Sequence, residues 1–308
     1  MNRKVAVIGA GNVGASTGLY LAERALADVV LIDIVEGMPQ GKALDMAQTT
    51  PLWHKGGRIE GANDLAAVKG AELVIMTAGF PRKPGMSRSD LLKANADIVR
   101  PAAEAVKRNA PEATVIVVTN PLDVMAWLFW HASGLPKQRV VGMAGMLDSA
   151  RMRAFIAMEL GVSPADVQAM VLGGHGDSMV PLARYTTVGG ITLGELVPGD
   201  RVAAIAQRTR DGGAEIVKLL KTGSAYYAPA MCAVEMAEAI LTDQKRLVPC
   251  SAHLDGQYGL KDLFIGVPVV LGAKGVERIV ELKLSAEELA ALQKSGKDVA
   301  DMIAELKG

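Results

Sequence analysis

Short, continuously apolar runs alternate with longer stretches of helical spacing through the first half of the chain. The runs are expected to be strands, at residues 4–8, 29–32, 73–76 and 114–118, with residues 140–141 at the edge of another. Residues 13–27, between the first two runs, have the leucine spacing of a helix. Strands that are apolar at every position are typical of a parallel sheet covered on both faces. This order predicts an α/β fold with a doubly wound parallel (Rossmann) sheet.

The pattern changes near residue 146. Helices are predicted over residues 146–160, 201–220, 229–242 and 285–306, and strands over residues 167–172, 245–254 and 267–271, the last two with alternating character. Ser285 and Glu288 have the spacing of a capping box at the start of the last helix. The mixed order predicts a second, α+β substrate domain. We therefore expect domains at residues 1–144 and 145–308, which suits a length of 308 residues.

Charge and composition narrow the class of protein. Lys plus Arg equals Asp plus Glu at 33 each, which argues against nucleic-acid or membrane-surface partners. No segment reaches the roughly 18 unbroken apolar residues of a membrane span, and the apolar run near the start is too short for a signal peptide. Cys232 and Cys250 lack metal-ligand spacing and are expected to be buried, reduced thiols. These features predict a cytoplasmic protein without a metal site.

A glycine-rich motif stands between the first predicted strand and the first predicted helix. It runs from Gly9 to Gly14 as GAGNVG, and its glycines permit a tight turn and a close approach of backbone N–H groups to a pyrophosphate. Asp33 follows 19 residues beyond Gly14, at the end of the second strand. A carboxylate there can bind a ribose 2′-hydroxyl and would repel a 2′-phosphate. The motif predicts NAD; the alternative is a glycine-rich turn in a nucleotide-free α/β protein.

Two further regions carry candidate chemistry. The segment 79–88 holds three cations within seven residues and follows a predicted strand, so it could close over an anionic substrate or be an ordinary surface loop. His175 is flanked by glycines and is one of four histidines, although a lone histidine is more often structural. Asp148 and Arg151 are three residues apart on one helix face, either as part of a site or as a surface ion pair.

Taken together, these motifs resemble the lactate/malate dehydrogenase family along nearly the whole chain, in its lactate-dehydrogenase-like malate dehydrogenase branch. The segments that carry the resemblance occur in the family's order. They are GAGNVG (9–14), GKALDM (41–46), AGFPRKPGMSR (78–88), VTNPLD (118–123), LDSARMR (147–153), GGHGDSMVP (173–181) and KTGSAYYAPA (221–230).

The resemblance implies roles for particular residues. His175 would be the catalytic acid/base and Asp148 its partner, because a neighbouring carboxylate raises a histidine pKa and fixes its tautomer. The implied substrate-binding residues are Arg82, Arg88, Asn120, Arg151 and Ser224. The implied NAD-binding residues are Gly9, Gly11, Asn12, Val13, Gly14, Asp33, Thr77, Ala78, Gly79, Asn95, Val118 and Asn120. The bond between Asn120 and Pro121 could be cis, as in the family.

Arg82 decides between substrates in this interpretation. It occupies the family position that reads the far end of the substrate, where malate dehydrogenases have arginine and lactate dehydrogenases have glutamine. Truncating one partner of a buried charged pair costs about 2–5 kcal/mol. The sequence therefore predicts reversible oxidation of (S)-malate to oxaloacetate, a reaction of the tricarboxylic acid cycle. The alternatives are another 2-hydroxy acid dehydrogenase, such as a lactate dehydrogenase, or a solvated role for Arg82.

Rivals from other classes fit less well. An NAD- and metal-dependent glycosidase would need metal ligands and a larger sugar-binding domain, and a non-catalytic NAD sensor would not need the intact catalytic set. Family members are dimers or tetramers, and the branch favours a homotetramer. Residues 152–160 and 231–240 fit interface helices and core-facing helices equally well.

Overall fold

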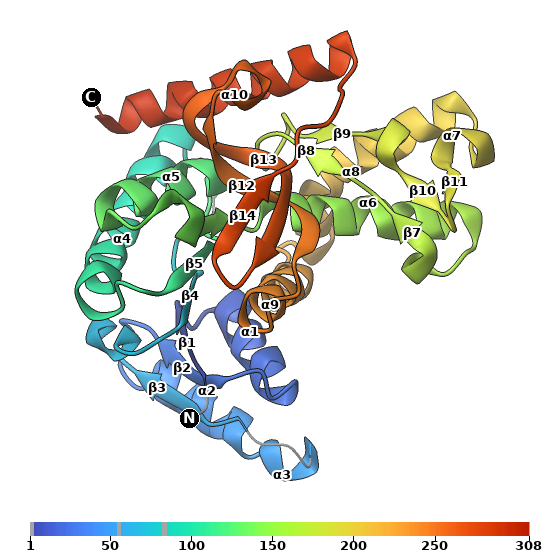
Figure 1. Ribbon diagram of the computed structural model, residues 1–308. Helices are drawn as coiled ribbons and strands as arrows, with labels where there is room; N and C mark the ends of the chain where they lie inside the picture. Colours follow the sequence, from blue (N-terminus) through green and yellow to red (C-terminus); the bar gives the residue numbers. More distant parts are fainter. Residues whose placement is uncertain (1–2, 54–56, 82–84, 308) are drawn as a thin grey trace.

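The computed structural model describes residues 3–53, 57–81 and 85–307 (Figure 1). Within these ranges the main sheet has nine strands, in the order β14-β13-β12-β6-β5-β4-β1-β2-β3. The first-half strands are all parallel, and all of them except β3 are almost fully buried, as their apolar runs predict. They are β1 (Lys4–Ile8), β2 (Asp28–Ile32), β3 (Ile59–Ala62), β4 (Leu73–Met76), β5 (Thr114–Val117) and β6 (Val140–Gly142). The predicted Rossmann-type sheet is confirmed.

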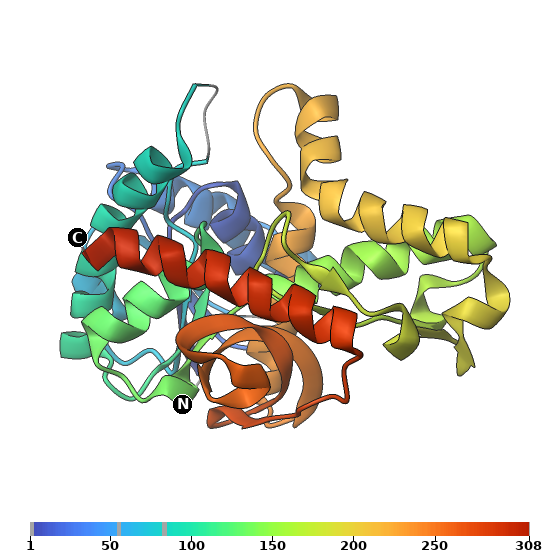
Figure 2. The ribbon, with the colours of Figure 1, turned by 90° about the horizontal axis from the view of Figure 1, so that it is seen from above.

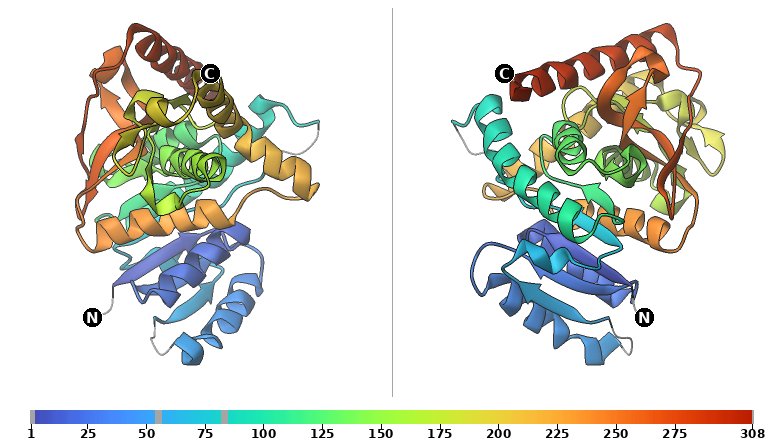
Figure 3. Two further views of the ribbon diagram at one scale, coloured as in Figure 1. Left: turned by 90° about the vertical axis from the view of Figure 1, so that its right-hand side faces the viewer. Right: turned by 60° about the vertical axis from the view of Figure 1, so that its left-hand side comes forward.

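Helices cover both faces of this sheet (Figures 1 and 3). On one face α4 (Arg88–Asn109) packs against α5 (Leu122–Ser133). On the other face α1 (Asn12–Glu23) packs against α9 (Tyr227–Leu241), which comes from the second half of the chain. The remaining first-half helices are α2 (Met38–Ala47) and the short α3 (Thr50–Trp53).

The long strands of the second half continue the same sheet. They are β12 (Arg246–Asp255), β13 (Lys261–Gly272) and β14 (Gly275–Ile279). β12 runs antiparallel to β6, with Ser251 opposite Gly142. A Cβ atom on Gly142 would lie 2.7 Å from the Cβ of Ser251, so only glycine permits this approach. β12 is buried at nearly every central position, because it is covered from both sides; its predicted alternation is wrong.

The rest of the second half forms a smaller unit around α6 (Ala144–Leu160) and α8 (Gly199–Leu220). The strand expected over residues 167–172 is wrong: β7 (Val167–Gln168) and β8 (Val171–Leu172) belong to different small sheets. The chain bends between them, so that Val167 and Val171 are both fully buried against α6. The other short elements are β9 (Val180–Pro181), β10 (Thr187–Val188), β11 (Ile191–Thr192) and α7 (Leu193–Leu196).

The ends of the helices follow capping residues and backbone angles more closely than they follow the apolar pattern. α1 ends at Glu23, four residues before its predicted end, and Ala25 then takes a positive φ of 53°. α10 (Ala286–Lys307) begins with the predicted capping box, since Ser285 N–H donates to Glu288 and Glu288 N–H donates to Ser285 Oγ. The division between residues 144 and 145 stays a prediction, because the larger apolar core draws on both halves.

Candidate active site

The predicted cofactor residues gather at the carboxyl ends of β1, β2, β4 and β5. Gly9 has a φ of 101°, and a Cβ there would lie 2.5 Å from the backbone N of Ala78. A Cβ on Gly14 would lie only 1.8 Å from the carbonyl oxygen of Gly9. Thr77 Oγ1 contacts the same oxygen at 3.0 Å. Gly9 and Gly14 are thus required by the tight packing of the turn between β1 and α1.

Gly11 differs from these two glycines, because a Cβ there would meet open space. It is the N-cap of α1, and no side chain within residues 3–53, 57–81 and 85–307 caps the first-turn amides, which begin with Asn12 and Val13. An uncapped helix N-terminus with room in front of it suits a pyrophosphate. The Asp33 carboxylate accepts hydrogen bonds from the N–H groups of Ala10 (2.8 Å) and Val35 (3.1 Å), which leaves lone pairs for ribose hydroxyls. These residues fit NAD.

Asn95 connects two loops at this edge of the sheet. Its fully buried amide accepts from Phe80 N–H at 2.7 Å and donates to the carbonyl groups of Phe80 (3.1 Å) and Asn120 (2.7 Å). It therefore ties the segment around Gly79 to the segment of Val118 and Asn120. All three Asn95 hydrogen bonds go to the backbone, so its contribution is to hold the loops. The Asn120–Pro121 peptide bond is cis, as the resemblance implied.

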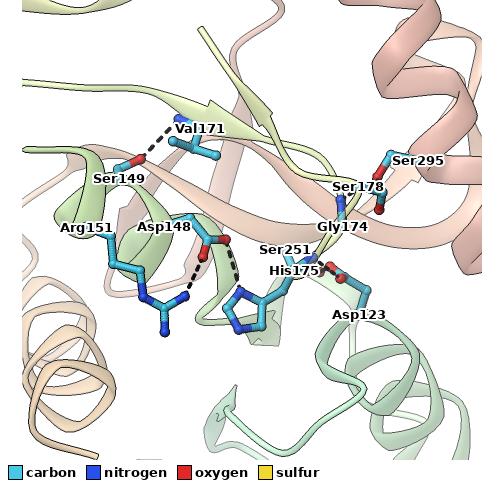
Figure 4. Close-up of polar contacts among 10 residues, drawn as sticks. All are labelled: Asp123, Asp148, Ser149, Arg151, Val171, Gly174, His175, Ser178, Ser251 and Ser295. Atoms are coloured by element: carbon cyan, nitrogen blue, oxygen red, sulfur yellow. Dashed lines mark hydrogen bonds and ion pairs between the residues drawn. The ribbon is translucent and has the colours of Figure 1, made fainter. Parts of the chain in front are cut away.

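His175, Asp148 and Arg151 form a buried cluster (Figure 4). The side-chain exposures are 13%, 2% and 13%, which rules out a surface ion pair. His175 Nδ1 lies 3.0 Å from Asp148 Oδ2, and Arg151 Nη1 donates to Asp148 Oδ1 at 3.4 Å. α6 supplies the acid and the arginine from one face, while the loop after β8 supplies the histidine. The structure thus brings His175 together with two residues that the sequence placed in another motif, LDSARMR.

The electrostatics of this cluster favour a protonated imidazole. Burial lowers the pKa of His175, but the charge of Asp148 and its hydrogen bond outweigh burial, so the pKa is raised above the ordinary value. A proton on Nδ1 is held by Asp148, which leaves Nε2 to exchange a proton with a substrate.

Arg151 has hydrogen-bonding capacity that the described residues do not use. Its Nε is buried and has no hydrogen-bond partner among them. Space for the side chain comes from two glycines in the middle of α8, since a Cβ on Gly212 would lie 3.2 Å from Arg151 Cδ, and one on Gly213 would lie 3.6 Å from Nη2. A buried guanidinium donor without a partner suits an anionic ligand. The motifs did not point to this glycine pair, although two adjacent glycines inside a predicted helix are a visible signal in the sequence.

Two further predicted substrate residues, Arg88 and Ser224, are exposed. Arg88 is the first residue of α4, after the capping Ser87, and its Nη2 forms an ion pair with Asp177 Oδ2 at 3.0 Å. Ser224 is exposed in the connection between α8 and α9. Figure 2 shows this connection and residues 85–87, directly before α4, rising on the same side of the molecule. Arg82 lies outside the described residues.

Three buried side chains near His175, those of Asp123, Ser251 and Ser295, were not identified from the sequence. Three successive N–H groups of the His175 loop each donate to a different element. Gly173 N–H donates to Gly266 O on β13 (2.9 Å), Gly174 N–H to Ser295 Oγ on α10 (2.8 Å) and His175 N–H to Asp123 Oδ2 on α5 (2.7 Å). Asp123 also accepts from Ser251 on β12. Asp123 is the last residue of the VTNPLD motif, which was the only available signal for this group.

Comparison with known proteins identifies the family. Residues 3–142 match the lactate/malate dehydrogenase NAD binding domain, and residues 145–307 match the alpha/beta C-terminal domain of the same family. The chain belongs to the lactate/malate dehydrogenase family, and its cofactor is NAD.

Full-length relatives carry the same resemblance. The malate dehydrogenase of Thermomicrobium roseum is 55% identical over 307 residues, covering 100% of this chain and 99% of that protein. The crystal structure of Cryptosporidium parvum malate dehydrogenase has a TM-score of 0.97 at 46% identity, covering 100% of this chain and 99% of that one. The C. parvum lactate dehydrogenase complexed with lactic acid and nicotinamide adenine dinucleotide has a TM-score of 0.97 at 45% identity, with the same coverage.

The described residues contain neither a metal-binding cluster nor a membrane-spanning helix. In that part of the chain, no group of three or more His, Cys, Asp or Glu side chains is arranged to hold a metal ion. None of the described helices is both long enough and apolar enough to cross a membrane.

Proposed function

We propose that this protein is an NAD-dependent malate dehydrogenase that interconverts (S)-malate and oxaloacetate. The observation that carries the proposal is the buried cluster of His175, Asp148 and Arg151 beside the NAD-binding edge of the sheet. Its full-length relatives include malate dehydrogenases at 53–55% identity.

His175 is the proton donor and acceptor in this proposal. In oxaloacetate reduction, its Nε2–H gives a proton to the keto oxygen while bound NADH supplies the hydride. Asp148 keeps the imidazole protonated and oriented, because its carboxylate faces Nδ1 at 3.0 Å. In malate oxidation the neutral ring accepts the hydroxyl proton at the same nitrogen. The raised pKa of His175 favours the protonated form, which reduction requires.

Arginines bind the two ends of the dicarboxylate. Arg151 receives the C1 carboxylate, and its Nε, which has no partner in the part of the chain that the structure describes, supports a two-point contact with that group. Arg88 polarises the keto group and must first leave its exposed ion pair with Asp177, a type of contact worth about 0–1 kcal/mol. We assign Arg82 to the C4 carboxylate, and Asn120 and Ser224 to the lining of the substrate site. The same proposal includes the NAD-binding roles assigned to Gly9, Gly11, Asn12, Val13, Gly14, Asp33, Thr77, Ala78, Gly79, Asn95, Val118 and Asn120.

The first test is the loss of NADH absorbance with matched oxaloacetate and pyruvate. Rapid oxidation with oxaloacetate and little with pyruvate supports malate dehydrogenase, and the reverse preference supports lactate dehydrogenase. Solved lactate dehydrogenases are as similar in fold as malate dehydrogenases, so the fold does not discriminate between these two activities. No turnover with either substrate overturns the proposed reaction class.

Arg82→Gln tests the specificity. We expect oxaloacetate turnover to fall by roughly 1.5–3.5 orders of magnitude, equivalent to about 2–5 kcal/mol, while pyruvate turnover is kept or rises. Lys83→Gln is the matched control, since it removes the neighbouring cation from the same segment. An unchanged ratio of the two turnovers in Arg82→Gln contradicts the assignment.

We also propose a cytoplasmic homotetramer acting in the tricarboxylic acid cycle. Exposed apolar side chains on α6 and α8 support association: Met158 is 68% exposed and Leu219 is 74% exposed. Residues 231–240 of α9 are mostly buried within one chain, which favours the core interpretation for them. Light scattering coupled to size exclusion measures the oligomeric state directly.

A further inference from the structure

Asp123 is a buried carboxyl group that the proposed proton transfer does not use. It lies in the first turn of α5 and is 4% exposed. Figure 4 shows it beside His175 on the side away from Asp148. Its Oδ2 accepts the backbone N–H of His175 at 2.7 Å. A carboxyl group in a protein core must have hydrogen-bond partners, because burying it without them costs free energy.

The backbone of the His175 loop depends on this contact. A buried N–H group without an acceptor costs about 1–3 kcal/mol, so nearly all such groups are paired. His175 lies outside the regular strands, and Asp123 is the acceptor that the structure gives to its N–H. Since the imidazole is attached to this same backbone, the contact fixes the position of the His175 Cα and so the position from which the ring contacts Asp148.

Ser251 completes the arrangement from the other half of the chain. It is fully buried on β12, and its hydroxyl donates to Asp123 Oδ1 at 2.6 Å. Both carboxyl oxygens of Asp123 are therefore occupied, one by the catalytic loop and one by the sheet. This chain of contacts connects β12, α5 and the loop of His175, and it leaves Asp123 little freedom to turn.

The negative charge of Asp123 also acts on the ring. Burial raises the pKa of Asp123 above its ordinary value, since the hydrogen bonds from Ser251 and His175 N–H, which favour the ionised form, offset only part of that effect. The charge of Asp123 raises the pKa of His175, in addition to the larger contribution of Asp148.

We propose that Asp123, braced by Ser251, is a positioning residue that holds the backbone of His175 so that its ring meets Asp148 and the substrate. The inference rests on the proposed oxaloacetate reduction for its kinetic test. Asp123 acts through His175 and has no direct contact with reacting atoms in this scheme.

Three variants separate its contributions. Asp123→Asn keeps the shape, an acceptor for His175 N–H and a polar partner for Ser251, and removes only the charge. Asp123→Ala removes the acceptor as well, and Ser251→Ala removes only the brace. Ser133→Ala is the matched control, because Ser133 is an equally buried serine on α5 that donates to Trp130 O.

In Asp123→Ala we expect kcat for oxaloacetate reduction to fall about a hundred-fold, the effect of a misplacement near 1 Å. The NADH Kd should be unchanged. Asp123→Asn should recover most of kcat, with its pH profile moved to lower pH, and Ser251→Ala should fall between wild type and Asp123→Ala. Wild-type kcat and pH profile in folded Asp123→Ala overturn the inference.

A second measurement does not depend on turnover. The chain has four histidines, and His175→Asn assigns the ring signal of His175 in an NMR titration. We expect the pKa of His175 to be lower in Ser251→Ala than in wild type, because a ring on a less firmly held backbone loses part of its contact with Asp148. It should also be lower in Asp123→Asn, through loss of the charge alone. An unchanged titration in Ser251→Ala overturns the inference even if Asp123→Ala fails to fold. If wild type turns over neither oxaloacetate nor pyruvate, the proposed function fails, while this titration still decides the role of Asp123.

Discussion

Two buried histidines show opposite electrostatic behaviour. His175 faces Asp148, and its pKa is raised. His253 on β12 lies between Trp130, at 4.7 Å between ring centroids, and Phe264, at 5.5 Å. Neither ring nitrogen of His253 has a hydrogen-bond partner among the described residues. Its pKa is lowered, first by burial and then by the charge of Lys137, against the weaker effects of Asp255 and Asp262.

The difference shows what makes a histidine useful for proton transfer here. Burial favours the neutral form of both rings, and only a close carboxylate reverses that preference. His253 is therefore an aromatic packing residue, although it lies only two residues from Ser251 in the network beside His175. The position of a carboxylate, and not depth in the core, separates the two roles.

The largest expected effect comes from replacing each ring in turn. His175→Asn should lower kcat by about 10²–10⁴-fold, the usual contribution of general acid–base catalysis, and keep NADH affinity. His253→Asn should keep most of the activity, because the contacts of that ring among the described residues are with Trp130 and Phe264, which are not predicted site residues. Steady-state kinetics and NADH fluorescence titration measure both quantities. Equal losses in the two variants would break the comparison.

Asp148→Asn should give His175 the electrostatic character of His253. Loss of a charged hydrogen bond worth about 1.5–3 kcal/mol predicts a fall in kcat of roughly 10- to 100-fold. The pKa of His175 should drop, so the pH at which reduction is half-maximal moves to lower values. Asp166→Asn, at an exposed acid, is the control. A pH profile that does not move in Asp148→Asn would contradict the role given to its charge.

The two rings should also affect stability with opposite signs. The pKa of His253 is lowered on folding, so the unfolded chain binds its proton first, and the free energy of unfolding decreases as pH falls through about 6.5. The pKa of His175 is raised on folding, so its stabilisation is full below about 6.5 and is lost as pH rises through the folded-state pKa. Urea unfolding between pH 5 and 8 should show a weaker acid loss in His253→Gln and a stronger one in His175→Asn. The same slope in both variants would refute this assignment of signs.

The smallest expected effect concerns the cysteines, which extend the comparison to thiols. Burial raises the pKa of Cys232 to about 12 and also raises that of Cys250. Neither residue should react measurably with a thiol reagent at pH 8 in the native protein, and both should react in urea. Rapid labelling of the folded protein would show that burial does not suppress the reactivity of these thiols.

The sequence predicts best those elements that depend on a single local pattern of residues. Continuous apolar runs predicted β1, β2, β4 and β5, and glycine spacing predicted the turn before α1. β3 was missed because Glu60 and Gly61 interrupt its apolar pattern. The union of β12–β14 with the first-half sheet depends on a contact between segments more than a hundred residues apart, for which a single sequence carries no local signal.

The site divides in the same way. His175, Asp148 and Arg151 were found from motifs, and the structure brings them into contact. Asp123, Ser251 and Ser295 act on backbone N–H groups or on each other, and such partnerships appear only once α5, β12 and α10 converge. Likewise, the sequence identified Arg88 as a candidate but gave no sign of its ion pair with Asp177.

The contact between β6 and β12 limits how the halves of such chains can be exchanged during evolution. A crossover near residue 144 joins a new second half to an old first half and so brings together two sheet edges with separate mutational histories. With a Cβ at position 142 only 2.7 Å from that of Ser251, any larger residue on the first edge separates the strands. Glycine at position 142 is therefore a condition for a folded chimaera. In a library of such chimaeras, the folded members should all carry a first half with glycine at this position.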